Sequence, residues 1–131
     1  MPGSIKEIIT TEHAPKAIGP YSAGVKTEQL IFTAGQLGII PESGDLIQGG
    51  IEQETRLALE NIQAVLKAAG SSLEMVVKTT VFLQDMADFS LMNNIYAGFF
   101  KENPPARSTI QVAALPKGAA VEIEAVALAG S

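Results

Sequence analysis

Two amphipathic helical segments lie between runs of β-branched and aromatic residues, and this alternation is the strongest constraint on the fold. The first segment covers residues 51–69 and is followed by Gly70, a suitable left-handed stop. Its apolar positions, which form one helical stripe, are Ala58, Leu59, Ile62, Val65, Leu66 and Ala69. The second covers residues 88–101, with Asp88 placed to accept N-terminal amide protons and Pro104 beyond its end. The sequence therefore predicts two helices.

The remaining apolar runs have the composition of β-strands. They are residues 30–34, 76–83, 108–113 and 121–128, with weaker candidates at 5–10 and 21–26. The order is three strands, a helix, a strand, a helix and two strands. Two helices cover only one face of such a sheet, so we expect an α+β protein whose second face is apolar and shared with other subunits.

The size and apolar character of the chain point to an oligomer. Its 131 residues suit a single domain, 1–131. Hydrophobic residues make up 47% and charged residues 18%, and the mean hydropathy is +0.23. A domain of this size buries only about two-thirds of its unfolded surface, so part of the apolar excess needs other subunits to cover it.

The residue types that are rare in the chain exclude several kinds of chemistry. The sequence has no cysteine and one histidine. Disulfides, thiolate nucleophiles, Cys/His zinc sites and haem-attachment motifs are therefore excluded. His13 lies in a polar stretch, where a solvated loop residue is expected. The glycines match neither of the common nucleotide-phosphate motifs.

The net charge of −5 and the pI near 4.8 disfavour a nucleic-acid partner. The first residues contain no apolar leader, and no apolar run approaches the ~18 residues of a membrane span. We therefore expect a cytoplasmic protein that makes no contact with a membrane.

Arg107 is the cation best placed for ligand binding. It follows Pro104 and Pro105 at the point where a helix ends and a strand begins. A guanidinium in this position can present two parallel N–H donors to a carboxylate. Spacing alone also allows an ordinary surface arginine, or a salt bridge to a distant acid.

Glu122 and Glu124 lie in a strand that is otherwise apolar. Because side chains alternate along a strand, both carboxylates share a face with Val126 and Leu128. A partly buried glutamate has a raised pKa and can exchange protons near neutral pH. The alternatives are a strand end that reaches solvent, or neutralisation by Lys78 or Lys117.

Several segments together resemble one known family. They are residues 13–15 (HAP), 17–22 (AIGPYS), 33–36 (TAGQ), 77–83 (VKTTVFL), 105–108 (PARS), 112–117 (VAALPK) and 121–125 (VEIEA). In this order, and over nearly the whole chain, they resemble the RidA family, also called YjgF, the small enamine and imine deaminases.

The resemblance implies a chorismate-mutase-like α+β fold, with one mixed sheet, two helices on one face, and a homotrimer around an internal β-barrel. It implies clefts between subunits that bind small imino-acid and keto-acid carboxylates, without a metal or cofactor. The implied reaction is hydrolysis of 2-iminobutanoate or 2-iminopropanoate to the 2-oxo acid and ammonia. The alternatives are a non-catalytic regulatory trimer that binds small carboxylates, and the endoribonuclease or translation-inhibitor activity ascribed to some relatives.

The same resemblance assigns roles to six residues. Arg107 would hold the substrate carboxylate, and Glu122 would deprotonate the attacking water and then protonate the leaving nitrogen. Thr109 would offer its backbone groups to the imine. The residues expected to shape the pocket are Tyr21, Gly35 and Asn93. Many relatives carry Cys in place of Thr109 and Ser in place of Ala34, which puts the substrate preference in question.

A tight turn over residues 116–119 would make a hairpin in which Leu115 pairs with Ala120 and Arg107 pairs with Leu128. Glu122 would then lie six residues further along, about 20 Å at ~3.3 Å per residue. One small substrate cannot bridge that distance. We therefore expect a site shared by two subunits, with Arg107, Thr109 and Asn93 from one, and Glu122, Tyr21 and Gly35 from the other.

Overall fold

The structure is a computed structural model that describes residues 5–130. Six strands and two α-helices make up its regular structure, together with three short 3-10 helices. In chain order the elements are β1 (Glu7–Ile9), β2 (Gly24–Lys26), β3 (Leu30–Thr33), α1 (Ile51–Ala68), η1 (Leu73–Met75), β4 (Val76–Leu83), η2 (Met86–Asp88), α2 (Phe89–Phe99), β5 (Ala106–Gln111), η3 (Pro116–Gly118) and β6 (Val121–Leu128).

Both predicted helices are present, but the predicted cap of the second is wrong. Gly70 follows α1 with a φ of 85°, the left-handed conformation expected there. The Asp88 side chain makes no capping hydrogen bond, because the short helix η2 directly precedes α2. The residue with the extended backbone of an N-cap is Asp85, before η2, and its side chain accepts the Ala87 N–H at 2.9 Å. Between residues 5 and 130, no helix is both long enough and apolar enough to cross a membrane.

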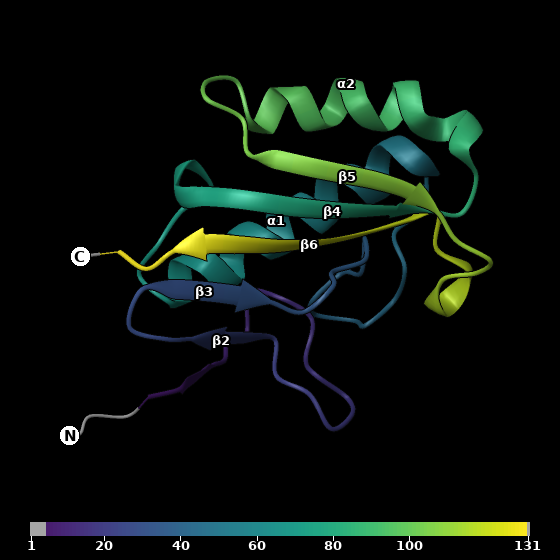
Figure 1. Ribbon diagram of the computed structural model, residues 1–131. Helices are drawn as coiled ribbons and strands as arrows, with labels where there is room; N and C mark the ends of the chain where they lie inside the picture. Colours follow the sequence, from purple (N-terminus) through teal and green to yellow (C-terminus); the bar gives the residue numbers. More distant parts are fainter. Residues whose placement is uncertain (1–4, 131) are drawn as a thin grey trace.

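The strands form one mixed sheet in the order β1-β2-β3-β6-β4-β5 (Figure 1). Only β4 and β5 run parallel, and α2 forms the crossover between them, as a parallel pair requires. The expected α+β fold with one mixed sheet and two helices is therefore confirmed. The strands expected at 5–10 and 21–26 are shortened to three residues each.

The predicted hairpin of the last two strands is wrong. β4 lies between β5 and β6, and Leu83 pairs with Gln111 on one side and with Val121 on the other. The turn at 116–118 is real, with Lys117 and Gly118 both at positive φ. It belongs to a longer connection that crosses the end of β4. A local turn signal does not tell whether a third strand inserts between the two that it joins.

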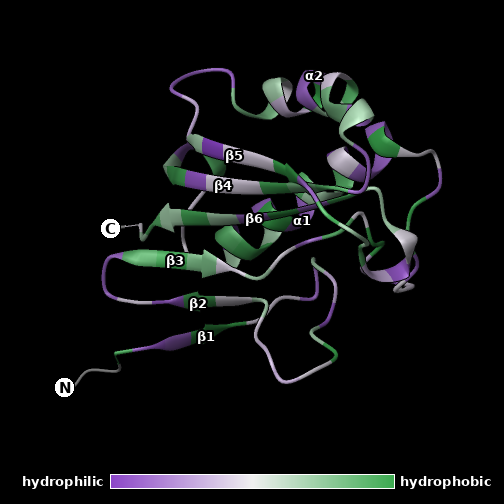
Figure 2. Cartoon of the chain, turned by 45° about the vertical axis from the view of Figure 1, so that its right-hand side comes forward, coloured by the Kyte–Doolittle hydropathy of each residue, from purple (hydrophilic) through white to green (hydrophobic). Residues whose placement is uncertain are grey.

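The helices and the core lie on one face of the sheet, here called the covered face. Figure 1 shows α1 behind the sheet and α2 alongside β5. Leu59 and Ile62 of α1 and Ile123 of β6 are almost completely buried. The opposite face, here called the open face, exposes Phe32, Ile110 and Leu128 by 42%, 45% and 43%. Figure 2 shows the hydrophobic colour along β3. The strand register also places Lys78, Glu122 and Glu124 on the open face, so this face is only partly apolar.

Candidate active site

Arg107 projects from β5 against one stripe of α2. Its Nη1 donates to Asn93 Oδ1 at 2.8 Å. Its guanidinium carbon lies 4.7 Å from the centre of the Tyr96 ring and 5.5 Å from that of Phe89. Positions 89, 93 and 96 have the i, i+4, i+7 spacing of a single helical face. Arg107 is thus held at the sheet edge by two rings and an amide oxygen.

Thr109 lies on the same face as Arg107, because side chains two residues apart on a strand point the same way. Its Oγ1 is buried and has no hydrogen-bond partner among residues 5–130. An unsatisfied buried hydroxyl costs about 1–3 kcal/mol, which a polar ligand group could recover. The structure therefore brings together three of the predicted site residues, Arg107, Asn93 and Thr109.

Glu122 lies beside Gly35 at a β-bulge. Phe32 pairs with Val126, and Gln36 forms an isolated bridge with Ile123, so the three residues 33–35 at the end of β3 and beyond it lie opposite two residues of β6. Thr33 Oγ1 accepts the Ala125 N–H at 3.0 Å within this bulge. A Cβ on Gly35 would overlap Glu122 Oε2 and lie 2.7 Å from Glu122 Cδ. Only glycine leaves room for the carboxylate in this position.

Burial raises the pKa of Glu122 above its ordinary value of 4.5, and the nearby charge of Glu124 raises the pKa further. Lys78, one of the cations that might have neutralised this pair, donates instead to Ser108 Oγ at 3.0 Å. Glu122 is half-buried, so it can contact a ligand, and its raised pKa lets it hold a proton at a higher pH than an ordinary glutamate does.

Arg107 and Glu122 of one chain point to opposite faces of the sheet. Arg107 pairs with Thr79, and Thr79 pairs with Ala125. Paired residues share a face, so Glu122, three residues from Ala125, lies on the other face and about 10 Å along the strands. The predicted separation of about 20 Å along a hairpin is therefore wrong, and the two side chains are separated instead by lying on opposite faces of the sheet.

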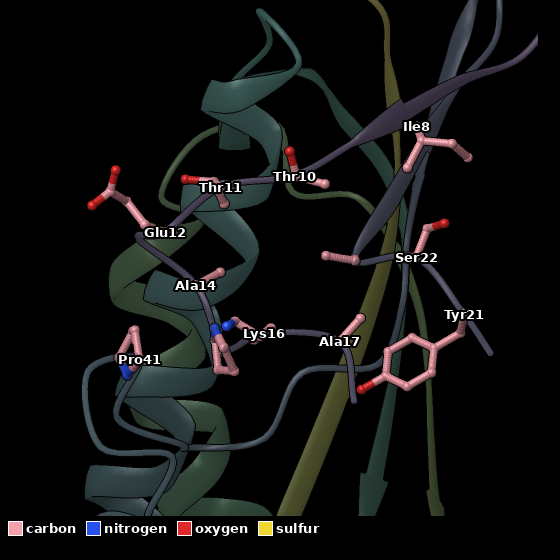
Figure 3. Close-up of a pocket in the computed structure, with 12 residues that line it drawn as sticks. Ile8, Thr10, Thr11, Glu12, Ala14, Lys16, Ala17, Tyr21, Ser22 and Pro41 are labelled. Carbon is pink, nitrogen blue, oxygen red and sulfur yellow. The ribbon is translucent and has the colours of Figure 1, made fainter. Parts of the chain in front are cut away.

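Tyr21 lies in the loop between β1 and β2. Its side chain is 53% exposed and lines a groove of about 690 Å³. Figure 3 shows Tyr21 on one side of this groove, with Glu12 and Pro41 on the other. Neither Arg107 nor Glu122 lines it. The six predicted residues thus fall into two clusters, plus Tyr21.

Within residues 5–130, no three His, Cys, Asp or Glu side chains gather in a way that could hold a metal ion. His13 is exposed, and its backbone N–H donates to Thr11 Oγ1 at 3.1 Å. The interpretation of His13 as a solvated loop residue is confirmed.

Glu54 is a buried carboxylate that the sequence analysis missed. It is only 5% exposed, and its Oε1 accepts the Ala120 N–H at 2.7 Å, two residues before Glu122. Burial raises its pKa, the backbone N–H of Ala120 opposes this, and the charge of Asp88 adds to the rise. In the sequence Glu54 looks like a solvated first-turn acid; only the position of β6 reveals its partner.

We expect Glu54→Ala to lower the free energy of unfolding by about 1–3 kcal/mol, because it leaves the Ala120 N–H without an acceptor. Glu54→Gln keeps an acceptor and removes the buried charge. Since the pKa of Glu54 is raised on folding, the native chain loses stability as the pH rises from 4.5 through the raised value. The free energy of unfolding of Glu54→Gln, measured by urea denaturation, should therefore rise relative to that of the native protein between pH 4 and 8. Equal losses for both variants would contradict this role.

The model of the endoribonuclease L-PSP family matches residues 11–129, nearly the whole chain. This chain belongs to that family, the RidA (YjgF) family. The resemblance inferred from the sequence motifs is therefore confirmed.

Two relatives of this RidA-family chain show the extent of the similarity. The human 2-iminobutanoate/2-iminopropanoate deaminase is 51% identical over 130 residues, which cover 99% of this chain and 95% of the human protein. A RutC family protein of Pyrococcus horikoshii is 51% identical over 123 residues, covering 94% of this chain and 98% of that protein.

A solved structure shows the same fold as this RidA-family chain. The Escherichia coli TdcF structure with bound serine superposes with a TM-score of 0.90 at 43% identity, covering 95% of this chain and 99% of TdcF.

Proposed function

We propose that this protein is an imine deaminase that hydrolyses 2-iminobutanoate and 2-iminopropanoate to 2-oxo acids and ammonia. The observation that carries the proposal is the guanidinium of Arg107, held against α2 by Tyr96 and Asn93 and lying on the same face of the sheet as the unpartnered hydroxyl of Thr109. Membership of the RidA family supports the deaminase assignment, as does 51% identity to the human 2-iminobutanoate/2-iminopropanoate deaminase. The bound serine of TdcF, a small amino acid with a carboxylate, supports the class of ligand.

The mechanism places each end of an imino acid against a different residue. Arg107 binds both carboxylate oxygens, which fixes the C=N carbon for attack. Glu122 takes a proton from a water as the water oxygen bonds to that carbon, and passes the proton to the nitrogen. Glu122 then carries the proton of the new hydroxyl to the amino nitrogen as the C–N bond breaks, so that ammonia leaves and the 2-oxo acid forms. One water is consumed and no electrons are transferred.

We propose that two subunits of a homotrimer build each site. Arg107, Asn93 and Thr109 come from one protomer, while Glu122, Gly35 and Tyr21 come from its neighbour. The opposite faces of Arg107 and Glu122 support this division, because one pocket in one chain cannot contain both side chains. The exposed apolar residues of the open face support burial against other protomers, as expected for a barrel built inside the trimer.

The deaminase proposal is tested by turnover of freshly generated 2-iminopropanoate, coupled to detection of the 2-oxo acid. The native protein should hasten hydrolysis above the spontaneous rate, and the series should extend to imines with larger side chains. If neither 2-iminopropanoate nor 2-iminobutanoate is hydrolysed faster than in buffer, while serine or 2-oxobutanoate still binds, the protein is a carboxylate-binding trimer without turnover.

Mixing two inactive variants tests the shared site. Arg107→Ala and Glu122→Gln chains, co-expressed with different tags and purified as mixed assemblies, should recover activity. In each mixed trimer, one of the three sites then carries both native residues. Mixed assemblies that form but stay inactive would place both residues in a site within one chain.

We expect Gly35→Ala to fold and to lose deaminase activity by about 10²-fold, because the new methyl displaces the Glu122 carboxylate. Gly98→Ala is the matched control, since a Cβ on Gly98 meets no described atom within 4 Å. Initial rates and circular dichroism of both variants provide the test. Full activity in Gly35→Ala would show that the position of Glu122 is not critical.

The family description makes RNA cleavage a second candidate function. The net charge of −5 opposes binding to a phosphate backbone. Purified native protein and Glu122→Gln should degrade labelled RNA at the same background rate. RNA cleavage that is lost in Glu122→Gln would favour the nuclease.

A further inference from the structure

The ring of Tyr96 lies beneath the guanidinium of Arg107. The distance from the guanidinium carbon to the ring centre is 4.7 Å, within the range of a cation–π contact. On its own helix the Tyr96 ring also lies 4.7 Å from the Phe100 ring, and Tyr96 is only 5% exposed. Arg107 therefore rests on a ring that is itself packed into the core.

A buried hydrogen bond fixes this ring from behind. The hydroxyl of Tyr96 lies 2.6 Å from Thr79 Oγ1, and Thr79 is only 1% exposed. Thr79 is the register partner of Arg107 across β4 and β5, so both side chains leave the sheet at the same level and on the same face. Tyr96 of α2 thus contacts Thr79 of β4 on one side and Arg107 of β5 on the other.

Arg107 contacts Asn93 and two rings, of which Tyr96 is nearer than Phe89, and the amide and the rings restrict different motions. The hydrogen bond from Nη1 to Asn93 fixes one corner of the guanidinium but leaves its plane free to tilt about that bond. The Tyr96 ring, 4.7 Å from the guanidinium carbon, is close enough to limit that tilt. A bidentate grip on a carboxylate uses two parallel N–H groups, so its strength depends on that plane.

We propose that Tyr96, held by Thr79, is a positioning residue that sets the plane of the Arg107 guanidinium for binding the substrate carboxylate. The proposal deepens the proposed function and rests on it for the role of Arg107. Neither Tyr96 nor Thr79 contacts the substrate. Their hydrogen bond acts on binding of the carboxylate, which ground state and transition state share, and so affects KM more than kcat.

Two isosteric variants remove this hydrogen bond, and a third is the matched control. Tyr96→Phe and Thr79→Val each delete one hydroxyl. Thr55→Val deletes another fully buried threonine hydroxyl, in α1, which has no hydrogen-bond partner in the described part of the chain. We measure KM and kcat for 2-iminopropanoate, and the Kd of 2-oxobutanoate by calorimetry.

Tyr96→Phe and Thr79→Val should each raise KM and Kd by about 3–10-fold while kcat changes less than about twofold. The double variant should match the single ones, because both hydroxyls belong to one bond. Thr55→Val should leave KM and Kd unchanged, and Thr79→Ser, which keeps a hydroxyl, should restore binding.

Two results would overturn the positioning role. The first is unchanged KM and Kd in Tyr96→Phe and Thr79→Val while Arg107→Ala abolishes 2-oxobutanoate binding. The second is a loss in Thr79→Ser as large as in Thr79→Val, which would indicate packing instead of a hydrogen bond. Failure of the proposed function looks different: the native protein then gives no turnover, whereas the Kd values still report on Arg107.

Discussion

Replacing Arg107 with alanine is expected to lower kcat/KM for 2-iminopropanoate by about 10²–10⁴-fold. The substrate carboxylate loses two charge-assisted hydrogen bonds, each contributing about 1.5–3 kcal/mol. Arg107→Lys keeps the charge but not the planar pair of donors, so it should recover only part of the activity. Steady-state kinetics on freshly generated imine measure both effects.

The chain offers a matched control in its only other arginine. Arg56 is exposed on α1, so Arg56→Ala makes the same change of net charge away from the candidate site. It should leave kcat/KM unaltered. Equal activity in Arg107→Ala and the native protein would remove the basis for carboxylate binding at β5, and with it the deaminase mechanism.

Replacing Glu122 with glutamine is expected to lower kcat by about 10²–10⁴-fold, the usual contribution of one general acid–base group. The native rate should fall as the pH is lowered, because the carboxylate must be ionised to accept a proton from water. Since burial and Glu124 raise the pKa of Glu122, this fall should begin above the ordinary value of 4.5. A pH–rate profile of the native protein gives the apparent pKa.

Glu124→Gln serves as the control for Glu122→Gln. It lies two residues further along the same strand and face and makes the same change of charge. It should keep activity and move the acid limb of the pH–rate profile to lower pH, because one cause of the raised pKa is removed. The result that would contradict this is an acid limb at the native pH in the profile of Glu124→Gln, together with the same limb in the residual activity of Glu122→Gln. The titrating group would then be a residue other than Glu122.

Periodicity was sufficient to predict the helices and most strands. The apolar stripe of residues 51–69 and the β-branched run 76–83 each contain their own signal, and both elements lie within a residue of the expected bounds. Strand pairing was different. The apolar runs around the turn at 116–118 have the pattern of a hairpin, yet β4 separates them, since the order of strands depends on contacts between distant residues.

The same distinction applies to the candidate site. Arg107 and Glu122 could be predicted from their sequence neighbours, because Arg107 follows two prolines and Glu122 lies in an otherwise apolar strand. Glu54 and Thr79 did not, because a first-turn acid and a strand threonine are ordinary residues until their partners Ala120 and Tyr96 are known. The predicted hairpin separated Arg107 and Glu122 by distance, whereas the observed register places them on opposite faces of the sheet. The proposed division of the site between subunits is the same in both cases.

The central place of β6 has a consequence for how the chain folds during synthesis. β1, β2 and β3 pair with one another, and β4 pairs with β5, but only β6 joins these two groups. Residues 121–128 form the last of the six described strands in chain order, so the two halves of the sheet remain unjoined until this strand has been made. A stop codon shortly before residue 121 would therefore remove the strand that joins the two halves.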